Sequence, residues 1–232
     1  MPSLNLSADA HAALDRPIWS ALNSAHRALA EGTALARRYP ATISPLAAVS
    51  DHTDAAWSDL AELAKDDVVA VVSLSPLDAV SGFEFRPSAL ARQMVATEPV
   101  QDIEAASIET LGRADVPAML ELTALTKPGP FMPRTHELGR YIGIRDGNRL
   151  AAMAGERMRL DGFTEISAVC VHPDHRGRGY AQTLIKTLMK AIVDRGETPF
   201  LHTYADNHGA IALYERLGFV SRTTLYFTVL RA

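Results

Sequence analysis

One stretch decides the fold of this chain: Ala168-Val169-Cys170-Val171-His172-Pro173-Asp174-His175-Arg176-Gly177-Arg178-Gly179-Tyr180-Ala181. It predicts an apolar strand, a basic loop with glycines, and an amphipathic helix over about 179–195. A helix N-terminus has unpaired backbone N–H groups and a partial positive charge. Glycines let that backbone approach an anion, and Arg176 and Arg178 add full charge. The stretch therefore predicts a cradle for phosphate groups.

Two common phosphate loops do not fit this stretch. A Walker-type loop needs Gly-Lys-Ser/Thr, which is absent here. A dinucleotide loop needs G-x-G-x-x-G, whereas Gly177 and Gly179 are followed by Gln182 where the third glycine belongs. The stretch also follows three consecutive predicted strands, at 140–144, 149–158 and 164–171, instead of lying in a βαβ unit. A nucleotide-dependent oxidoreductase is therefore disfavoured.

A second motif follows downstream, Asn207-x-x-Ala210-x-x-x-Tyr214-x-x-x-Gly218-Phe219. Together with Arg176-x-x-Gly179-x-Ala181 after a strand ending in Val-x-Val, it resembles the acyl-CoA site of the GNAT acyltransferase superfamily. The resemblance covers about residues 102–232, and the stretch from Lys127 to His202 looks like the glycine N-acyltransferase-like subgroup. It implies an α/β (α+β) fold with a mixed, mostly antiparallel sheet that splays at the acyl-CoA site.

The resemblance implies acetyl-CoA as co-substrate and no metal. The strands predicted at 164–171 and 200–204 would separate, and the pantetheine arm would pair with the backbone of Val169 and Val171. Asn207 would also bond the pantetheine. The pyrophosphate would lie on the backbone N–H groups of Arg176, Gly177, Arg178, Gly179 and Ala181, with a contribution from Gln182.

The implied chemistry is direct attack of an amine on the thioester carbonyl. The backbone N–H of Val171 would stabilise the oxyanion. Tyr214 would protonate the leaving thiolate, since the ordinary pKa of tyrosine, about 10, is close to that of a CoA thiol. The base stays open between Glu165, His202 and a water relay, because some relatives have a carboxylate where this sequence has His202. A histidine with a pKa of about 6.5 can serve near neutrality.

Structural interpretations compete with these roles. The glycine loop is also compatible with a solvated turn, Tyr214 with a core tyrosine, and Glu165 with His202 as a satisfied polar pair. Cys170, with His172 and Asp174 nearby, suggests a nucleophile, but its apolar surroundings favour a buried thiol. His172 and His175 lack a third ligand, so we predict no metal site.

Residues 126–138 contain three prolines, which predicts that this segment is largely a loop. In GNAT proteins this region usually builds the acyl-acceptor site. Lys127, Arg134 and Arg140 are candidates to meet a substrate carboxylate, with Phe131 as an apolar wall. An ordinary rim loop is an equally good interpretation.

The composition and net charge of the chain limit the kinds of binding partner that we expect. The chain has 232 residues, 47% hydrophobic and 22% charged, with a net charge of −4, which predicts a globular protein. Residues 1–100 hold 7 basic and 12 acidic residues, whereas residues 101–232 hold 16 and 15. We expect no nucleic-acid partner and no membrane span. One cysteine and no recognisable signal peptide favour the reducing cytoplasm.

We predict two domains, an accessory α/β domain over 1–101 and a GNAT domain over 102–232. The first would hold helices at 15–38, 51–63 and 87–96 and strands at 41–49 and 68–72. The second would add a strand at 105–111, helices at 114–125 and 207–217, a strand at 200–204, and a final β pair at 219–221 and 224–230. The first domain would be a degenerate GNAT-like domain, a cover for the cleft, or a homodimer contact.

The sequence thus predicts an N-acetyltransferase that transfers acetyl from acetyl-CoA to a primary amine of a small molecule or peptide. An enzyme using another acyl-CoA or an amino-acid acceptor is the alternative within the same class. A non-catalytic acyl-CoA-binding module is the alternative from a different class.

Overall fold

The computed structural model describes residues 6–77, 80, 82–85, 88–98 and 107–232. Its main sheet consists of β4 (Val68–Ser73), β5 (Glu84–Phe85), β6 (Ala89–Ala96), β7 (Glu109–Leu111), β8 (Tyr141–Asp146), β9 (Arg149–Leu160), β10 (Phe163–Val171), β11 (Thr198–Tyr204) and β12 (Phe219–Arg231). The order is β4-β12-β6-β11-β10-β9-β8-β7, and β5 pairs with β12. Among the described pairings only β10–β11 is parallel within this sheet.

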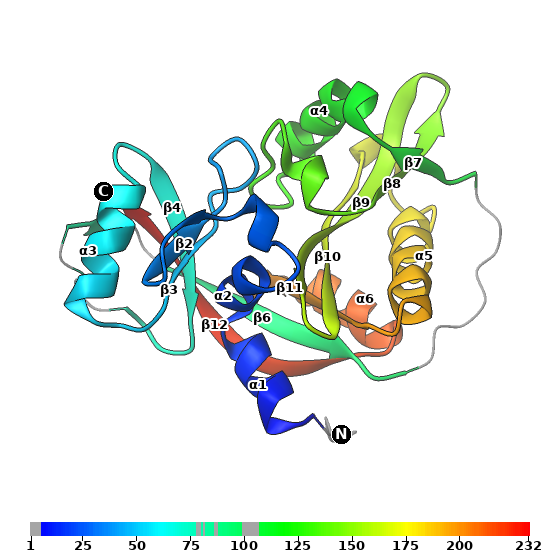
Figure 1. The fold of residues 1–232 in the computed structure, drawn as a ribbon. Helices are drawn as coiled ribbons and strands as arrows, with labels where there is room; N and C mark the ends of the chain where they lie inside the picture. Colours follow the sequence, from blue (N-terminus) through cyan, green and yellow to red (C-terminus); the bar gives the residue numbers. More distant parts are fainter. Residues whose placement is uncertain (1–5, 78–79, 81, 86–87, 99–106) are drawn as a thin grey trace.

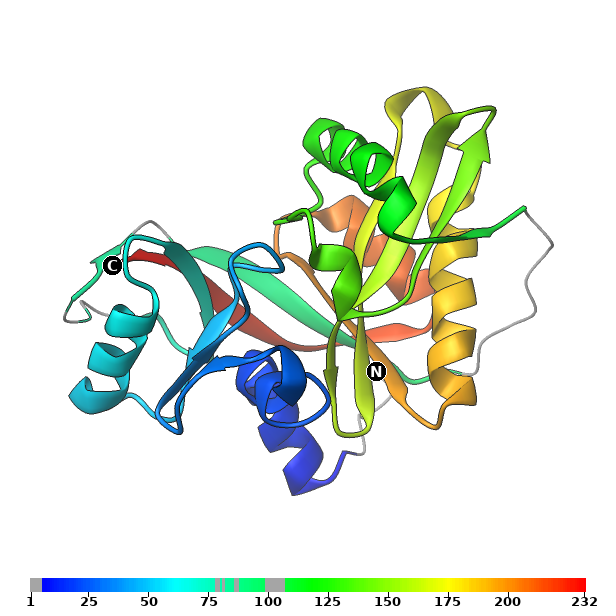
Figure 2. The same cartoon turned by 45° about the horizontal axis from the view of Figure 1, so that its top comes forward.

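Helices cover both faces of the sheet (Figures 1 and 2). They are α1 (Ala8–Asp15), α2 (Pro17–Asn23), α3 (Asp54–Leu63), α4 (Val116–Thr126), α5 (Tyr180–Asp194) and α6 (His208–Arg216), with short 3-10 turns η1 (Arg27–Leu29), η2 (Arg113–Asp115), η3 (Thr135–Leu138) and η4 (Pro173–His175). A small sheet of β1 (Glu31–Gly32), β2 (Ala36–Arg38) and β3 (Ala47–Val49) lies near α3.

Two apolar clusters show which helix lies on which face. Leu201 of β11 packs with α5 and with Tyr214 of α6. Phe200, its neighbour on the strand, packs with Leu14 of α1 and Ile18 of α2. Because successive strand residues point to opposite faces, α5 and α6 cover one face of β11 and α1 and α2 cover the other.

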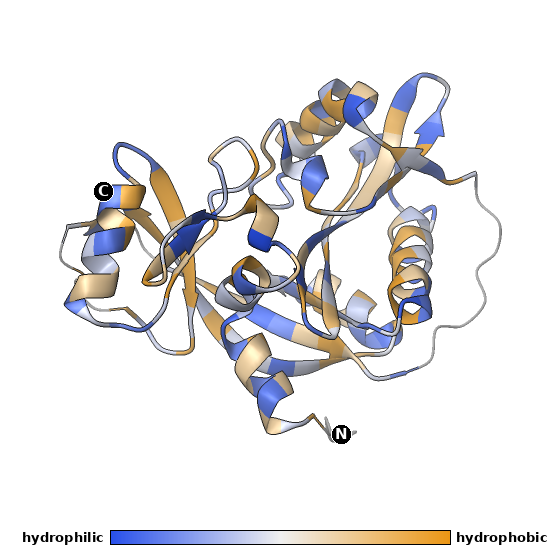
Figure 3. Ribbon diagram, viewed as in Figure 1, coloured by the Kyte–Doolittle hydropathy of each residue, from blue (hydrophilic) through white to orange (hydrophobic). Residues whose placement is uncertain are grey.

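The strand β4 is packed on both of its faces. Val69 and Val71 belong to the cluster around α3, whereas Ala70 and Val72 belong to the cluster around α1 and α2. A strand buried on both sides needs no polar alternation. Figure 3 accordingly shows β4 as an apolar run.

The predicted elements around the motif are confirmed, with ends that move by one or two residues. They include the strand at 164–171, the helix at 179–195, the strand at 200–204 and the helix at 207–217, which are β10, α5, β11 and α6. The helix α5 buries the stripe Leu184, Ile185, Leu188, Met189 and Ile192 against the sheet. Apolar spacing of three and four residues therefore predicted this helix correctly.

Three predictions in the fold are wrong. The helix expected at 87–96 is the strand β6, which β11 and β12 flank on its two sides. The long helix expected at 15–38 breaks into α2, η1 and the β1–β2 hairpin, where Gly32 turns the chain at φ +116°. The final β pair is the single strand β12, which continues through a register shift between Ser221 and Thr223.

The predicted domain boundary at residue 101 falls outside the described residues. Strands from before it, β4 and β6, lie in the same sheet as β7 to β12 from after it. The division into domains at 1–101 and 102–232 therefore stays a prediction. The main sheet contains strands from both segments. In the described part of the chain, every helix is too short or too polar to cross a bilayer.

Candidate functional site

The strands β10 and β11 separate partway along their length. Their parallel pairing runs from Phe163–Thr198 to Glu165–Phe200 and stops there, although β10 continues to Val171 and β11 to Tyr204. In β10 a register shift against β9 begins at Ser167, and Ala168 adopts φ +51°. A bulge of this kind bends a strand locally. It turns β10 just beyond the last pair with β11.

A pocket of about 250 Å³ lies at this opening. Its lining residues come from β6, α4 and the loop after it, β9, β10, β11, α6 and β12: Ala91, Thr126, Lys127, Pro128, Gly129, Pro130, Arg157, Ile166, Ser167, Ala168, Val169, His202, Thr203, Tyr204, Asn207, Ala210, Tyr214 and Phe227. Of the predicted site residues it brings together Val169, His202, Asn207 and Tyr214. Val171, Glu165 and the loop 176–182 are not among its lining residues.

The helix α6 places Tyr214 at the pocket. Asn207 caps this helix, since its Oδ1 accepts from the backbone N–H of Ala210 at 3.1 Å. Burial raises the pKa of Tyr214 to about 12. The phenol therefore keeps its proton across the neutral range and can act as a proton donor, although it is a weaker acid than an exposed tyrosine.

The predicted anion loop leads into α5. Gly177 and Gly179 both adopt φ +77°, and Gly179 is the N-terminal cap residue of the helix. A Cβ added at either glycine would meet no other part of the protein within 4 Å. Within the described residues neither Arg176 nor Arg178, both exposed, is engaged in an ion pair. The loop thus has open space, exposed positive charge and a helix N-terminus in one place.

Glu165 forms the centre of a buried charged cluster. Its two carboxylate oxygens accept from Nε and Nη2 of Arg157 at 2.7 and 2.6 Å, and Oε1 also meets Nδ1 of His202 at 2.7 Å. Burial acts to raise the pKa of Glu165, but the Arg157 charge and the hydrogen bonds from Arg157 and His202 outweigh it and lower this pKa to about 2. Glu165 is fully buried and stays ionised, so it is a weak base.

The other nitrogen of His202 faces Gln93, the residue opposite it on β6. His202 Nε2 lies 3.1 Å from Gln93 Nε2. Sequence reasoning missed both Gln93 and Arg157. Arg157 had a signal, since Asp161-Gly162 predicts a turn that brings Arg157 and Glu165 together across a hairpin. Gln93 had none, because its segment was predicted to be a helix.

The loop after α4 reaches the pocket only in part. Lys127 lines it, at a left-handed φ of +50°. Arg134 instead pairs with Glu137 through two hydrogen bonds, and Phe131 packs edge-on against Tyr141. Neither Arg134 nor Arg140 is a lining residue.

Cys170 is buried as predicted, at 5% exposure. Burial raises the pKa of its thiol to about 12, and a thiol so protonated is a poor nucleophile. Within residues that the structure describes, no three His, Cys, Asp or Glu side chains gather as metal ligands.

Comparisons with known proteins agree with this geometry. Residues 141–228 match the family of FR47-like proteins. The chain is 34% identical over 129 residues to the N-alpha-acetyltransferase RimI of Mycobacterium tuberculosis, a match that covers 51% of this chain and 80% of that protein. It is 32% identical over 123 residues to the ribosomal protein bS18-alanine N-acetyltransferase of Salmonella typhimurium, which covers 50% and 82%.

A solved structure matches nearly the whole chain. It is a GNAT-family acetyltransferase structure from Novosphingobium aromaticivorans, 38% identical, with a TM-score of 0.87 over 94% of this chain and 98% of that one. The glycine N-acyltransferase-like subgroup stays a prediction. The predicted GNAT fold is confirmed, and the chain belongs to the GNAT superfamily of N-acetyltransferases and is an acyltransferase enzyme.

Proposed function

We propose that this enzyme transfers an acetyl group from acetyl-CoA to a primary amine by direct attack. One observation carries the proposal. The pairing of β10 and β11 stops at Glu165–Phe200, and the pocket in the resulting opening is lined by both Tyr214 and His202. Residues from both faces of the sheet line this pocket, so we expect a thioester and an amine to enter from opposite sides.

The cofactor side is the face of α5 and α6. The resemblance implies that pantetheine follows the backbone of Val169 and Val171 and meets Asn207. It implies that the pyrophosphate lies on the loop that leads into α5. The exposed arginines and open glycines of this loop fit such an anion. Val169, Asn207 and Tyr214 line the pocket from this side, which supports the assignment.

The acceptor side is the face of α1 and α2. His202 lies on the same side of β11 as Phe200, which packs with these helices. We assign His202 as the base. Its Nδ1 is bound to an ionised Glu165, so an imidazolium formed on proton uptake would be stabilised by that carboxylate. Glu165 then acts through His202 as a positioning residue.

The acetyl transfer needs three proton movements. A proton leaves the ammonium of the acceptor for Nε2 of His202, and the free amine attacks the thioester carbonyl. Tyr214 donates its phenolic proton to the sulfur as the C–S bond breaks, and the nitrogen of the new amide returns its second proton to the Tyr214 phenolate. The backbone N–H of Val171 is our candidate for the oxyanion. General acid and base groups of this kind each contribute about 10²–10⁴ in rate.

The class of the acceptor is also a proposal, and the names of the relatives support it. One of them is named an N-alpha-acetyltransferase, and another a ribosomal protein bS18-alanine N-acetyltransferase. We propose a primary amine on a small molecule or a peptide N-terminus. The lone cysteine is a buried free thiol, which agrees with the cytoplasmic location that we propose.

The deciding experiment combines binding and turnover. Thermal unfolding with acetyl-CoA, longer acyl-CoA esters and free CoA should show stabilisation that grows with ligand concentration. A panel of amines and peptides with free N-termini should then release CoA. Binding without CoA release on any amine would favour the acyl-CoA-binding module, and faster release from a longer ester would favour another acyl donor.

A further inference from the structure

The amide of Gln93 has one fixed orientation. Its Nε2 lies 2.8 Å from the backbone carbonyl of Leu14, which can only accept a hydrogen bond. Its Oε1 lies 2.8 Å from Nη1 of Arg222, which can only donate. Gln93 is fully buried, so water does not compete for these contacts. The nitrogen, not the oxygen, must therefore face His202.

This orientation dictates the protonation state of His202. Gln93 Nε2 donates its second hydrogen toward His202 Nε2 at 3.1 Å, so that ring nitrogen must accept and carry no proton. The ring proton is then on Nδ1, where it is donated to Glu165 Oε1 at 2.7 Å. A second proton on Nε2 would place two donors face to face across a buried contact.

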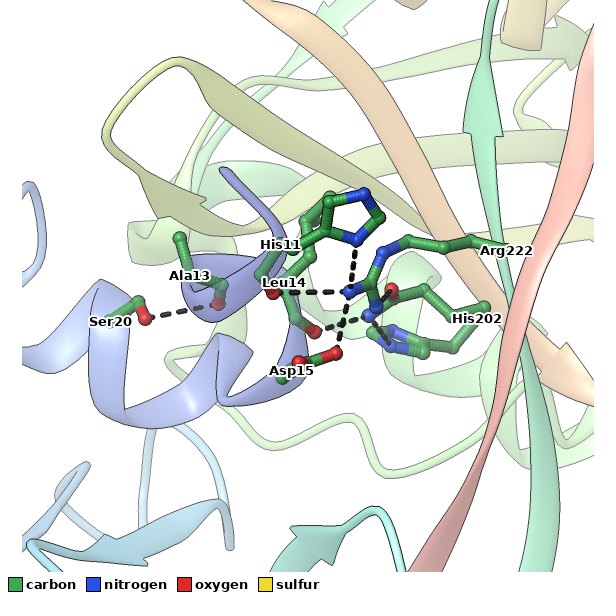
Figure 4. Close-up of polar contacts among 8 residues, drawn as sticks. His11, Ala13, Leu14, Asp15, Ser20, His202 and Arg222 are labelled. Atoms are coloured by element: carbon green, nitrogen blue, oxygen red, sulfur yellow. Dashed lines mark hydrogen bonds and ion pairs between the residues drawn. The ribbon is translucent and has the colours of Figure 1, made fainter. Parts of the chain in front are cut away.

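Arg222 is in turn anchored on α1. Its Nη2 lies 2.5 Å from Asp15 Oδ1 and 3.1 Å from both the carbonyl and Nδ1 of His11. The Arg222 side chain is 5% exposed, so the Asp15 pair is partly buried. Figure 4 shows His11, Leu14 and Asp15 of α1 converging with Arg222 and His202. Residues near the start of the chain are thus connected through Arg222 and Gln93 to His202, which lines a pocket built mainly from the second half.

We propose that Gln93 is a positioning residue that holds His202 neutral, with the ring proton on Nδ1 and no proton on Nε2. Arg222 supports this role because it fixes the orientation of the Gln93 amide. The inference rests on His202 as the base of the proposed function. The bond that Gln93 makes to the lone pair joins two neutral groups. A charged ammonium makes a hydrogen bond about twice as strong, so an acceptor amine can replace it.

Several charges surround His202 and would compete with this effect. Glu165 on β10 favours the imidazolium, whereas Arg157 on β9 and Arg222 on β12 oppose it. On α1, Asp15 and His11 lie behind Arg222. Glu165 contacts the ring directly at Nδ1, and Arg157 binds the same carboxylate. The Gln93 donor acts at the other nitrogen, where an N–H group can be accepted only by an unprotonated Nε2.

The test replaces Gln93 by two residues of similar size. In Gln93→Glu a carboxylate oxygen faces Nε2 and favours the imidazolium, since an opposite charge within ~4–6 Å shifts a pKa by about 1–3. In Gln93→Met the donor is lost without new charge. Ser20→Ala is the matched control, because Ser20 donates to the Ala13 carbonyl of α1 at 3.0 Å and is not a hydrogen-bond partner of Gln93 among the described residues.

Ring nitrogen chemical shifts of ¹⁵N-histidine-labelled protein give the first readout, with His202→Gln used to assign the signal. We expect the neutral Nδ1–H tautomer at neutral pH in the wild type and in Ser20→Ala. Gln93→Glu should raise the pH of the His202 titration by about one unit or more. Gln93→Met should raise the pH of the His202 titration by less. If Gln93→Glu does not fold, the result for Gln93→Met decides the question. An Nε2–H tautomer in the wild type, or an unmoved titration in the variants, overturns the inference.

The pH profile of kcat/KM gives the second readout. Neutral His202 is the active form, so a raised pKa moves the acidic limb of the profile to higher pH. Gln93→Glu should lose activity near neutrality and recover it as the pH rises, while Ser20→Ala keeps the wild-type profile. If the nitrogen shifts behave as expected but the acidic limb does not move, His202 is not the base. The role given to His202 under the proposed function then fails, while the tautomer set by Gln93 stands.

Discussion

The guanidinium of Arg157 and the carboxylate of Glu165 form a two-pronged ion pair inside the protein, with N–O distances of 2.7 and 2.6 Å. The side chains are 13% and 0% exposed. Tyr39 and Tyr141, both buried, lie close enough for this pair to affect their pKa values. The pair thus links the wall of the pocket to the core of the protein.

Breaking this pair should destabilise the protein strongly. Glu165→Gln leaves the Arg157 charge buried without a counter-ion, which costs about 3–5 kcal/mol. The measurement is the free energy of unfolding in urea. Glu137→Gln is the control, since Glu137 also pairs with an arginine through two hydrogen bonds but at the surface. We expect the control to lose ~1 kcal/mol or less. Equal losses in the two variants would contradict a special role for burial.

The same carboxylate predicts a pH dependence of stability. The pKa of Glu165 falls from its ordinary 4.5 to about 2 on folding. A depressed pKa contributes stability that is fully present above the unfolded value and is lost as the pH falls toward the folded one. The free energy of unfolding should therefore drop between about pH 4.5 and 2. The free energy of unfolding of Glu165→Gln should change less with pH over this window. Parallel curves for wild type and variant would show that other carboxylates dominate the pH dependence.

Tyr214→Phe should slow the reaction more than it weakens CoA binding. The variant removes a proton donor and keeps the ring that packs against Phe219. We expect kcat to fall by about 10²-fold or more, with the Kd for acetyl-CoA within about threefold of the wild type. Steady-state kinetics and calorimetry measure the two quantities. A loss confined to Kd would mean that Tyr214 is only a wall of the pocket.

Gly179→Glu should weaken acetyl-CoA binding by at least about tenfold, because it places a bulky negative charge at the cradle. Gly196→Glu is the matched control. Gly196 lies beyond the other end of α5, with the same φ of +77° and with no atom within 4 Å of an added Cβ. Both variants therefore place glutamate at the same left-handed φ. If the two bind acetyl-CoA equally, the pyrophosphate does not bind at this loop.

A chain that starts at residue 102 should not form the native sheet. It would lack β6, whose two edges pair with β11 and β12. It would also lack Gln93 and the α1 contacts of Arg222. We expect no cooperative unfolding transition by circular dichroism and no acetyl transfer. A folded, active fragment would show instead that 1–101 is a separable domain.

Local sequence predicted the elements that its own spacing determines. The loop from Arg176 to Gly179 and the stripe of α5 need no distant partner to be recognised. The β6 segment Ala89–Ala96 is different, since alanine, leucine, arginine, glutamine and methionine favour helices. Pairing on both edges overrides that preference. Propensity could not reveal it because the partner strands lie far along the chain.

The site was predictable to the extent that motifs mark it. His202, Asn207, Val169 and Tyr214 do meet at one pocket. Gln93 and Arg222 could not be predicted, because their roles depend on which residues face each other across β11, β6 and β12. The expected break after Ser221 concealed that Arg222 sits within a strand, at the register shift that lets β12 continue. A prediction of the sheet order is needed before these residues can be connected to His202.

The central place of β6 also constrains how the protein folds. This strand is synthesised about 100 residues before β11 and longer still before β12, which are its only partners in the described sheet. Closing loops of that length makes folding slow compared with that of proteins rich in local contacts. Until then both edges of an apolar strand are exposed, a condition that favours aggregation. We therefore expect the nascent chain to depend on chaperones, and its yield to fall when synthesis outpaces them.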